Sequence, residues 1–506
     1  MSYCNRRDFL KIAGYGTLAL PWATTSYGAK ARQSHPNVLF IAVDDLRPEL
    51  GCYGNTRILS PHIDRLAREG MRFNRAYCQQ PICMASRASL MTGYRPDHGN
   101  IYSCDAVASL LPDARTLNKH FEQNGYHVWA TGKIYHHAQD HAAQFGARHV
   151  QPEGQWKGRG YLAEDSIRQM QAYAKIYDKI RGGDSNGRGP AFEAPDVPDN
   201  AYADGARTDL AIDQLRRFQG TEKPFFMAVG YSKPHLPFNA PKKYWDLYSA
   251  DDIQLATNPF LPRGATEFTP YQFGELRNYC GIPKDDKVLP DDLSRQLKHG
   301  YYACVSYIDA QIGRLLKALD RSQMRDNTVI VLWGDHGWKL GEHGMWCKHT
   351  TFELDCRVPM IFSVPGMQHA GTATEAMSEF VDIYPTLCRL CGLDCPDHLQ
   401  GDSLEPVLND PKIDWHEAAF TVWPKQHRRD PDRVIMGYTI ACGRYRYTEW
   451  TRRQSGQVLA RELYDHAVDP AENENIAEAA GMEATVERMS RILDKGQGWR
   501  RDRSGR

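Results

Sequence analysis

The chain has 506 residues, of which 42% are hydrophobic and 25% charged, and its 62 basic and 62 acidic residues give a formal charge of zero at pH 7. This length predicts one large domain and a smaller one. The balanced charge argues against nucleic acid and membrane surfaces as partners. An anionic substrate would therefore have to be held by a local cluster of cations.

The N-terminal residues are expected to form a targeting segment. Residues 5–11, NRRDFLK, carry a twin-arginine pattern, and the apolar run at 12–23 ends near the small residues 29–31. This run is shorter than the ~20 apolar residues that cross a bilayer; the alternative is an arginine pair that precedes a buried helix by chance. We predict a signal over residues 1–31, export of a bacterial protein by the twin-arginine translocase to the periplasm or the medium, and no integral membrane segment.

Four short apolar runs, at residues 37–43, 126–130, 225–229 and 328–333, each lead into polar residues. Runs without polar alternation are typical of strands that are covered on both faces. Apolar residues at helical spacing occupy residues 60–70, 204–218 and 301–319. This alternation predicts an α/β fold with a large, mostly parallel sheet flanked by helices. Ligands of such sheets bind at the carboxyl ends of the strands, where these polar residues fall.

Two further segments bear on domain organisation. Residues 151–198 are irregular and rich in glycine, proline and charge, which predicts a long surface excursion. Residues 424–433, PKQHRRDPDR, predict the approach to a smaller C-terminal unit. In that unit the pattern from 434 to 450 predicts two short strands, and residues 483–493 predict a closing helix.

Three carboxylates follow the first and the last of the four runs: Asp44 and Asp45 after one, Asp335 after the other. Together at one sheet edge they would repel each other unless a cation lay among them. A hard divalent cation with oxygen ligands, calcium before magnesium, meets that need. His336 would add one contact or act through a water molecule. The alternative for the Asp44-Asp45 pair is an ordinary capped turn.

Cations also gather at this edge, and they would neutralise a tetrahedral oxyanion, which indicates sulfate or phosphate ester chemistry. They are Arg87, Lys133, His136, His235 and Lys348. Taken singly, each of them could be a solvated surface residue or a satisfied core group.

The segment 83–93, CMASRASLMTG, resembles the signature of the type I, formylglycine-dependent sulfatases, and the resemblance extends from about residue 36 to the C-terminus. The stretches at 43–54, 131–136, 230–238 and 334–349 are similar to the iduronate-2-sulfatase branch of that family. The resemblance implies an alkaline-phosphatase-like catalytic domain over residues 36–428. It also implies a C-terminal subdomain over 429–506 with a short antiparallel sheet.

The resemblance also implies a role for each candidate residue. Cys83 would be oxidised to formylglycine by a formylglycine-generating or anaerobic sulfatase-maturing enzyme, although Ala85 stands where the family's signature more often has proline. One Ca²⁺ would be bound by Asp44, Asp45, Cys83, Asp335 and His336. Arg87 would hold the hydrated aldehyde, Lys133 and Lys348 the sulfate oxygens. His136 would accept a proton, and His235 would protonate the leaving sugar oxygen.

The expected substrate is a sulfated oligo- or polysaccharide, with the 2-O-sulfate of a uronic acid as the target. The source would be a glycosaminoglycan or an algal polysaccharide such as fucan or ulvan. Candidates to contact the sugar, because each borders a sulfate-binding motif, are His98, Trp338, His349 and Arg357. Two alternatives remain: a phosphodiester or phosphonate monoester hydrolase of the same superfamily, and a sulfated-sugar-binding protein without turnover.

Overall fold

The structure, a computed structural model, describes residues 35–102, 105–181, 187–285, 287–425 and 434–495. The predicted signal over residues 1–31 lies outside these ranges and stays a prediction. Within the described ranges, no helix is both long enough and apolar enough to cross a membrane.

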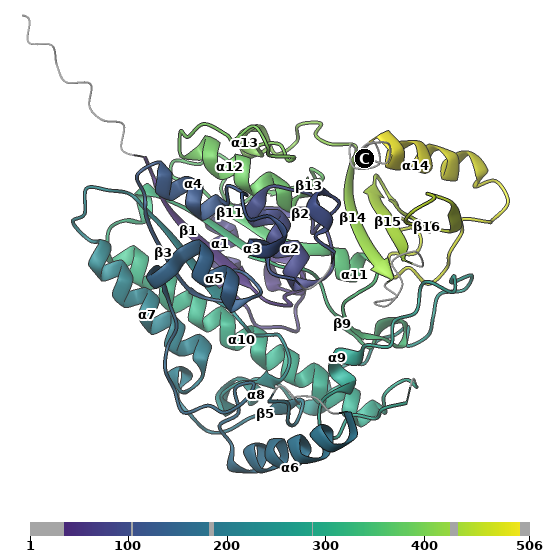
Figure 1. The fold of residues 1–506 in the computed structure, drawn as a ribbon, viewed down its shortest axis with the longest axis horizontal. Helices are drawn as coiled ribbons and strands as arrows, with labels where there is room; N and C mark the ends of the chain where they lie inside the picture. The colour runs from purple at the N-terminus through teal and green to yellow at the C-terminus, as the bar shows by residue number, and fades with distance from the viewer. Residues whose placement is uncertain (1–34, 103–104, 182–186, 286, 426–433, 496–506) are drawn as a thin grey trace, which may run out of the picture. The chain divides into compact units, whose positions relative to one another are not determined.

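A nine-stranded sheet lies at the centre of the large domain, in the order β12-β2-β11-β8-β1-β6-β3-β4, with β13 also paired to β2 (Figure 1). β1 (Asn37–Val43) lies between β6 (Phe225–Tyr231) and β8 (Thr328–Gly334) and is parallel to both. β3 (His127–Gly132) is parallel to β6 on its other side. The four predicted strands are thus confirmed, and their carboxyl ends share one edge of the sheet.

The sheet is mixed at its other end. β11 (Arg357–Ser363) runs antiparallel to β8 and to β2 (Met71–Tyr77). The remaining strands of this sheet are β4 (His149–Val150), β12 (Ala373–Thr374) and β13 (Ser378–Glu379). The α/β class and the large, flanked sheet agree with the prediction.

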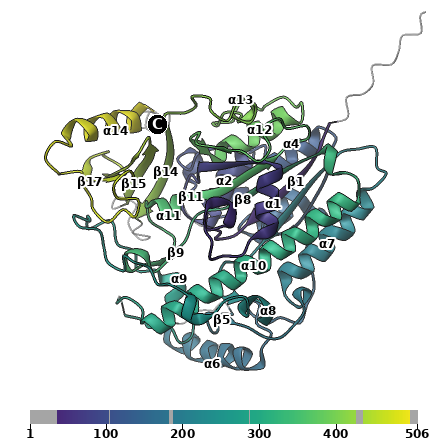
Figure 2. The same ribbon diagram turned by 180° about the vertical axis from the view of Figure 1, so that it is seen from behind.

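Helices cover both faces because alternate side chains of a strand point to opposite sides. Leu39, Ile41 and Val43 of β1 belong to one core, and Phe40 and Ala42 to the other. The first core contains residues of α1 (Pro61–Glu69), α7 (Ala203–Phe218) and α10 (Asp291–Arg321). The second contains residues of α2 (Cys83–Thr92), α4 (Leu117–Gln123), α5 (Ala138–Phe145) and α12 (Ile383–Leu390). Figure 2 shows α1 and α10 in front of the sheet, on the face opposite α2.

The three predicted helices are confirmed, although α10 begins at Asp291 rather than near residue 301. The predicted surface excursion at 151–198 needs a correction, because it contains the helix α6 (Glu164–Arg181). Short elements occupy the connections: α3 (Val107–Leu110), α8 (Lys242–Trp245), α9 (Gly274–Arg277), α11 (Glu353–Cys356), α13 (Glu405–Asn409), β5 (Phe192–Glu193), β7 (Phe238–Asn239), β9 (Lys339–Leu340) and β10 (Trp346–Cys347).

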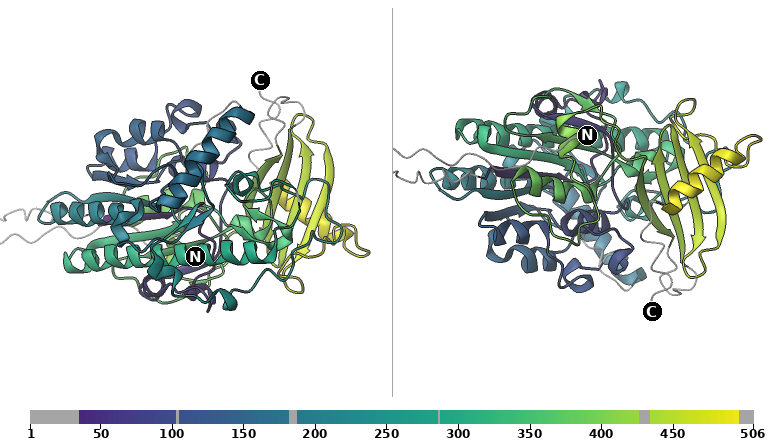
Figure 3. Two further views of the ribbon diagram at one scale, coloured as in Figure 1. Left: turned by 90° about the horizontal axis from the view of Figure 1, so that it is seen from below. Right: turned by 90° about the horizontal axis from the view of Figure 1, so that it is seen from above.

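The C-terminal part forms a four-stranded antiparallel sheet in chain order (Figure 3). Its strands are β14 (Ala418–Lys425), β15 (Ile435–Cys442), β16 (Tyr445–Arg452) and β17 (Val458–Asp465). The helix α14 (Glu483–Lys495) packs against β15 and β16. The two predicted strands and the closing helix are present, and β14 and β17 extend the sheet. The predicted boundary at residues 428–429 lies outside the described residues.

Candidate active site

The acidic residues meet because β1 and β8 are neighbours and both end at the same edge. Asp335 donates its backbone N–H to the Val43 carbonyl (3.2 Å), and Asp45 donates its backbone N–H to Asp335 Oδ1 (2.9 Å). Asp45 has a left-handed backbone, with φ 57°. This turn places Asp44, Asp45 and Asp335 together, all of them buried.

Arg87 joins two of these carboxylates. It lies one helical turn after Cys83 on α2, and its side chain is fully buried. Nε donates to Asp335 Oδ2 (2.9 Å) and Nη2 donates to Asp44 Oδ1 (3.1 Å), while Lys133 Nζ lies 2.5 Å from Asp44 Oδ2. Burial raises the pKa of Asp44, but Lys133 and Arg87 outweigh it and hold this pKa well below its usual range.

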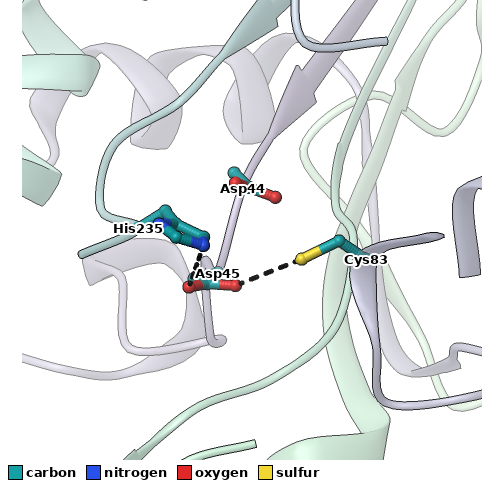
Figure 4. Close-up of side chains that lie close together, drawn as sticks. All are labelled: Asp44, Asp45, Cys83 and His235. Carbon is teal, nitrogen blue, oxygen red and sulfur yellow. Dashed lines mark hydrogen bonds and ion pairs between the residues drawn. The ribbon is translucent and has the colours of Figure 1, made fainter. Parts of the chain in front are cut away.

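Cys83 is the first residue of α2 and faces the same acids. Its Sγ is 3.2 Å from His336 Nε2 and 3.9 Å from Asp45 Oδ1. Figure 4 shows Cys83 and His235 approaching Asp45 from opposite sides. Burial, reinforced by the charge of Asp44, raises the pKa of the Cys83 thiol well above its usual value. As an unmodified residue, Cys83 is therefore a neutral thiol in this site.

Asp45 is held on its other side by Lys348. Lys348 Nζ is 3.0 and 3.1 Å from the two carboxylate oxygens of Asp45, and His336 Nε2 is 3.3 Å from Oδ1. Burial and the neighbouring Asp44 charge raise the pKa of Asp45 to about 7, although Lys348 opposes them. An additional cation would stabilise the ionised form of a buried carboxyl group whose pKa is raised in this way.

The donor set fits such a cation. One ligand atom each from Asp44, Asp45, Cys83 and His235 lie within 4.8 Å of one another, and the same holds for Cys83, Asp335 and His336. Three of these six donors, from Asp44, Asp45 and Asp335, are carboxylate oxygens, which hard divalent cations prefer. The structure therefore places a candidate acidic metal site at the N-terminus of α2.

His235 lies opposite Cys83, after β6. Its Nε2 is 4.0 Å from Asp45 Oδ2 and 2.9 Å from Glu275 Oε1, and its Nδ1 is 2.6 Å from the Leu236 carbonyl oxygen. Burial lowers the pKa of His235, whereas the Glu275 carboxylate acts in the opposite direction. The sequence analysis missed Glu275, because it lies in the four-residue helix α9 and follows none of the predicted strands.

His136 lies after β3 and has an exposed side chain, with its ring 4.7 Å from that of His137. Desolvation by the protein around the ring and the nearby charge of Lys133 lower the pKa of His136. A lowered pKa keeps the His136 ring neutral at pH 7 and also makes it a weaker base, so its role as proton acceptor stays a prediction.

Three of the four predicted sugar contacts, His98, His349 and Arg357, have side chains that are at least partly accessible. His98 is exposed and stacks on Tyr94, with ring centroids 3.9 Å apart. His349 is half-buried and follows Lys348 directly; its ring stacks on Trp423 at 4.9 Å and meets the edge of Tyr271 at 4.8 Å. Their contact with a sugar stays a prediction.

The structure contradicts the prediction for Trp338 and places Arg357 away from the candidate site. Trp338 is fully buried, and its ring lies 4.6 Å from Lys348 Nζ, so it supports a site cation and has no surface to offer a sugar. Arg357 donates from Nε to the Asn74 carbonyl (2.6 Å) and lines a depression of about 680 Å³. The described residues around that depression include none of the acids or cations near Cys83.

Comparisons with known proteins identify the family of the chain. A family profile described as Sulfatase matches residues 36–393, and one described as N-sulphoglucosamine sulphohydrolase, C-terminal, matches residues 341–498. Iduronate 2-sulfatase of Homo sapiens is 31% identical to this chain over 87% of this chain and 90% of its own.

Two solved structures share the fold. Phosphonate monoester hydrolase of Agrobacterium radiobacter superposes with a TM-score of 0.70 at 22% identity, covering 92% of this chain and 96% of its own. BT1596, a 2-O GAG sulfatase, superposes with a TM-score of 0.68 at 22% identity, covering 93% of this chain and 94% of its own. The profile match spans well over half of the sequence, and the human relative is aligned along most of it: the chain belongs to the sulfatase family and is a sulfuric ester hydrolase.

Proposed function

We propose that this sulfatase removes the 2-O-sulfate of a uronic acid in a sulfated oligo- or polysaccharide, using formylglycine made from Cys83 and one calcium ion. The observation that carries the proposal is the position of Cys83. It lies at the start of α2, 3.2 Å from His336 Nε2 and 3.9 Å from Asp45 Oδ1, within the acidic and cationic cluster.

Both absent groups fit the residues around them. Calcium would be held by Asp44, Asp45, Asp335 and His336 beside the modified Cys83, and it would offset the charge of the bound sulfate. Formylglycine, as its hydrate, would supply an oxygen nucleophile and a means to release sulfate, neither of which a neutral thiol provides.

The chain's own basic residues would perform the remaining steps. Arg87 lies one turn along α2 from Cys83 and would orient the modified side chain. Lys133, which contacts Asp44, and Lys348, which contacts Asp45, would hold the anionic oxygens of the ester. His235 would donate a proton to the leaving sugar oxygen, and the neutral ring of His136 would accept one during sulfate release.

The substrate class rests on similarity. The human relative is an iduronate 2-sulfatase, and the fold neighbour BT1596 is a 2-O GAG sulfatase, which together favour a 2-O-sulfated uronic acid. The test is a screen of size-matched disaccharides sulfated at one position only. We expect the 2-O-sulfated uronate to be the best substrate; a larger kcat/KM for a 6-O- or N-sulfated hexosamine would contradict this assignment.

The modification of Cys83 is tested by the mass of the tryptic peptide 76–87, AYCQQPICMASR, from protein produced together with a sulfatase-maturing enzyme. We expect Cys83 to have lost its sulfur and to react with a carbonyl probe. Cys78, in the same peptide, is an internal control that should remain a thiol. An unmodified Cys83 in protein that still turns over the ester would exclude formylglycine as the nucleophile.

The second candidate function is hydrolysis of phosphonate monoesters, which the fold similarity to the Agrobacterium radiobacter enzyme favours. Matched phenyl esters of sulfate and of a phosphonate separate the two activities. We expect the sulfate ester to react with the higher kcat/KM, and the reverse order would favour the phosphonate function.

We further propose export through the twin-arginine translocase, on the basis of residues 5–11. Replacing Arg6 and Arg7 together by lysine should leave the protein in the cytoplasm of its bacterial host. Recovery of this variant from the periplasm in wild-type amounts would contradict the proposal.

A further inference from the structure

Glu275 bridges two basic side chains that the proposed mechanism uses separately. Its Oε1 is 2.9 Å from His235 Nε2, and its Oε2 is 2.8 Å from Lys348 Nζ. The Glu275 side chain is 15% exposed, so water screens these contacts less than on an open surface. Lys348 Nζ also lies 3.0 Å from Asp45 Oδ1. One carboxylate thus links the His235 ring to a lysine that reaches the acidic metal site.

The helix that carries Glu275 is fixed independently of the large sheet. α9 packs against β10, the strand directly before Lys348. At its N-terminal end Phe273 has a left-handed backbone, with φ 39°. At its other end the Arg277 guanidinium lies 4.0 Å from the centroid of the Phe273 ring and donates to the carbonyls of Pro283 (2.8 Å) and Lys287 (2.6 Å). These contacts hold Glu275 at a defined position between the two cations.

We infer that Glu275 is a positioning residue, which orients the His235 imidazole and the Lys348 ammonium toward the sulfate ester. The inference rests on the proposed function for the roles of these two cations. His235 Nδ1 is held by the Leu236 carbonyl, so the contact at Nε2 is the second point that fixes the ring. The leaving oxygen would share the Nε2–H group with Glu275 in a three-centre hydrogen bond, and the carboxylate would keep the ring aimed while the proton moves. A displacement of about 1 Å in such a group costs on the order of 10²-fold in rate.

Leaving-group dependence tests this role, because a general acid matters most for a poor leaving group. The measured quantity is the ratio of kcat/KM for an activated aryl ester, 4-nitrocatechol sulfate, to kcat/KM for a 2-O-sulfated uronate disaccharide. We expect His235→Ala to raise this ratio by about 10²-fold or more and Glu275→Gln to raise it by about tenfold, since the ring is retained but misaimed. The double variant should have the ratio of His235→Ala alone, because Glu275 acts on this ratio through His235.

The matched control is Glu353→Gln, which removes another partly buried carboxylate that pairs with a cation, in this case Arg446. It should lower the melting temperature and leave the ratio unchanged. The inference is overturned if Glu275→Gln keeps the wild-type ratio, or if its effect on the ratio multiplies with that of His235→Ala. Should Glu275→Gln not fold, Glu275→Asp provides the same test, because its carboxylate is withdrawn by one methylene from both cations.

Crystal structures of the wild-type and Glu275→Gln proteins separate this inference from the proposed function. Turnover by the wild-type enzyme decides the proposed function. The structures decide the positioning role without turnover: we expect the His235 ring or the Lys348 ammonium to move in the variant. If both side chains keep their wild-type positions, Glu275 does not position them, whatever ester the enzyme hydrolyses.

Discussion

Two arginines of this chain are buried in nearly the same way, and only Arg87 lies in the candidate active site. Arg87 is 0% exposed and Arg446 is 1% exposed. Each bridges two carboxylates and lies 5.3 Å from the centroid of an aromatic ring. The partners are Asp44, Asp335 and Trp333 for the first, and Glu353, Glu472 and Tyr77 for the second.

The difference lies in what surrounds each pair of carboxylates. Around Arg446, Glu353 accepts from the Tyr77 hydroxyl (3.1 Å) and Glu472 lies 3.0 Å from His466 Nε2, so each acid has its partner. Around Arg87, Asp45 adds a further carboxyl group whose pKa is raised to about 7. A buried ion pair alone is therefore weak evidence for a site. Three carboxylates gathered beside a cysteine at a helix N-terminus, one of them with a raised pKa although Lys348 contacts it, are stronger evidence.

Replacing the cysteine near each arginine by alanine should give the largest difference in turnover between the two clusters. We expect Cys83→Ala to lower kcat/KM by more than about 10³-fold, because the nucleophile is lost, while the melting temperature changes little. Cys356, a buried residue near Arg446, is the matched control, and Cys356→Ala should retain full turnover. Sulfate release and thermal unfolding check both variants. Wild-type turnover by Cys83→Ala would mean that Cys83 is not the source of the nucleophile.

Removing each guanidinium should separate function from stability. Arg446→Met leaves two buried carboxylates without their cation and should lower the free energy of unfolding by about 3–5 kcal/mol, with kcat retained below the melting temperature. Arg87→Met should destabilise the protein by a similar amount and also lower kcat by at least 10²-fold. Urea unfolding and turnover at low temperature measure the two effects. Equal kcat values for the two variants would remove the functional distinction between these arginines.

Calcium affinity should depend on pH through Asp45. Burial and Asp44 raise the pKa of Asp45 to about 7, so below pH 7 a proton must leave before a cation binds. We expect calcium affinity to fall by about tenfold per pH unit from pH 7 to pH 5 and to change little above pH 7. Calorimetric titration of metal-stripped protein measures it. An affinity that stays constant between pH 5 and 7 would contradict the assignment of Asp45 as a ligand.

In the metal-free protein, the pH dependence of folding stability should also differ between the two clusters. The contribution of Asp45 is present at low pH and is lost as the pH rises through about 7, because its pKa is raised in the folded state. Glu353 behaves in the opposite way: burial raises its pKa, but Arg446 outweighs this and lowers it to about 2. Its contribution is therefore present above the ordinary glutamate pKa and is lost as the pH falls toward about 2.

The fold was predictable where local pattern and burial agree. β1, β3, β6 and β8 are almost entirely buried, so their sequences are predominantly apolar. β2 was not predicted, because its sequence MRFNRAY mixes buried and half-buried positions near the end of the sheet. α6 was missed because few of its described side chains are buried, which leaves only a weak apolar stripe.

The candidate site was predictable as far as it follows strands. Asp44, Asp335 and His235 come directly or shortly after strands that share an edge, so topology alone brings them together. Glu275 reaches the site from a long connection, and only tertiary packing places it there. Trp338 was predicted to contact the sugar because it borders a predicted motif along the chain. That proximity did not reveal that its ring is buried in the core.

Changes of aromatic rings should give the smallest effect and the finest contrast between the two clusters. Trp338 lies beneath Lys348, and tryptophan is the ring that attracts a cation most strongly. Trp338→Phe should weaken this attraction by about 0.5–1 kcal/mol and raise KM for the sulfate ester by about two- to fivefold, with kcat nearly unchanged. Tyr77→Phe keeps the ring beside Arg446 and should leave KM unchanged. Steady-state kinetics decides between them; an equal change in KM for both variants would mean that Trp338 acts on the fold in general and not on Lys348.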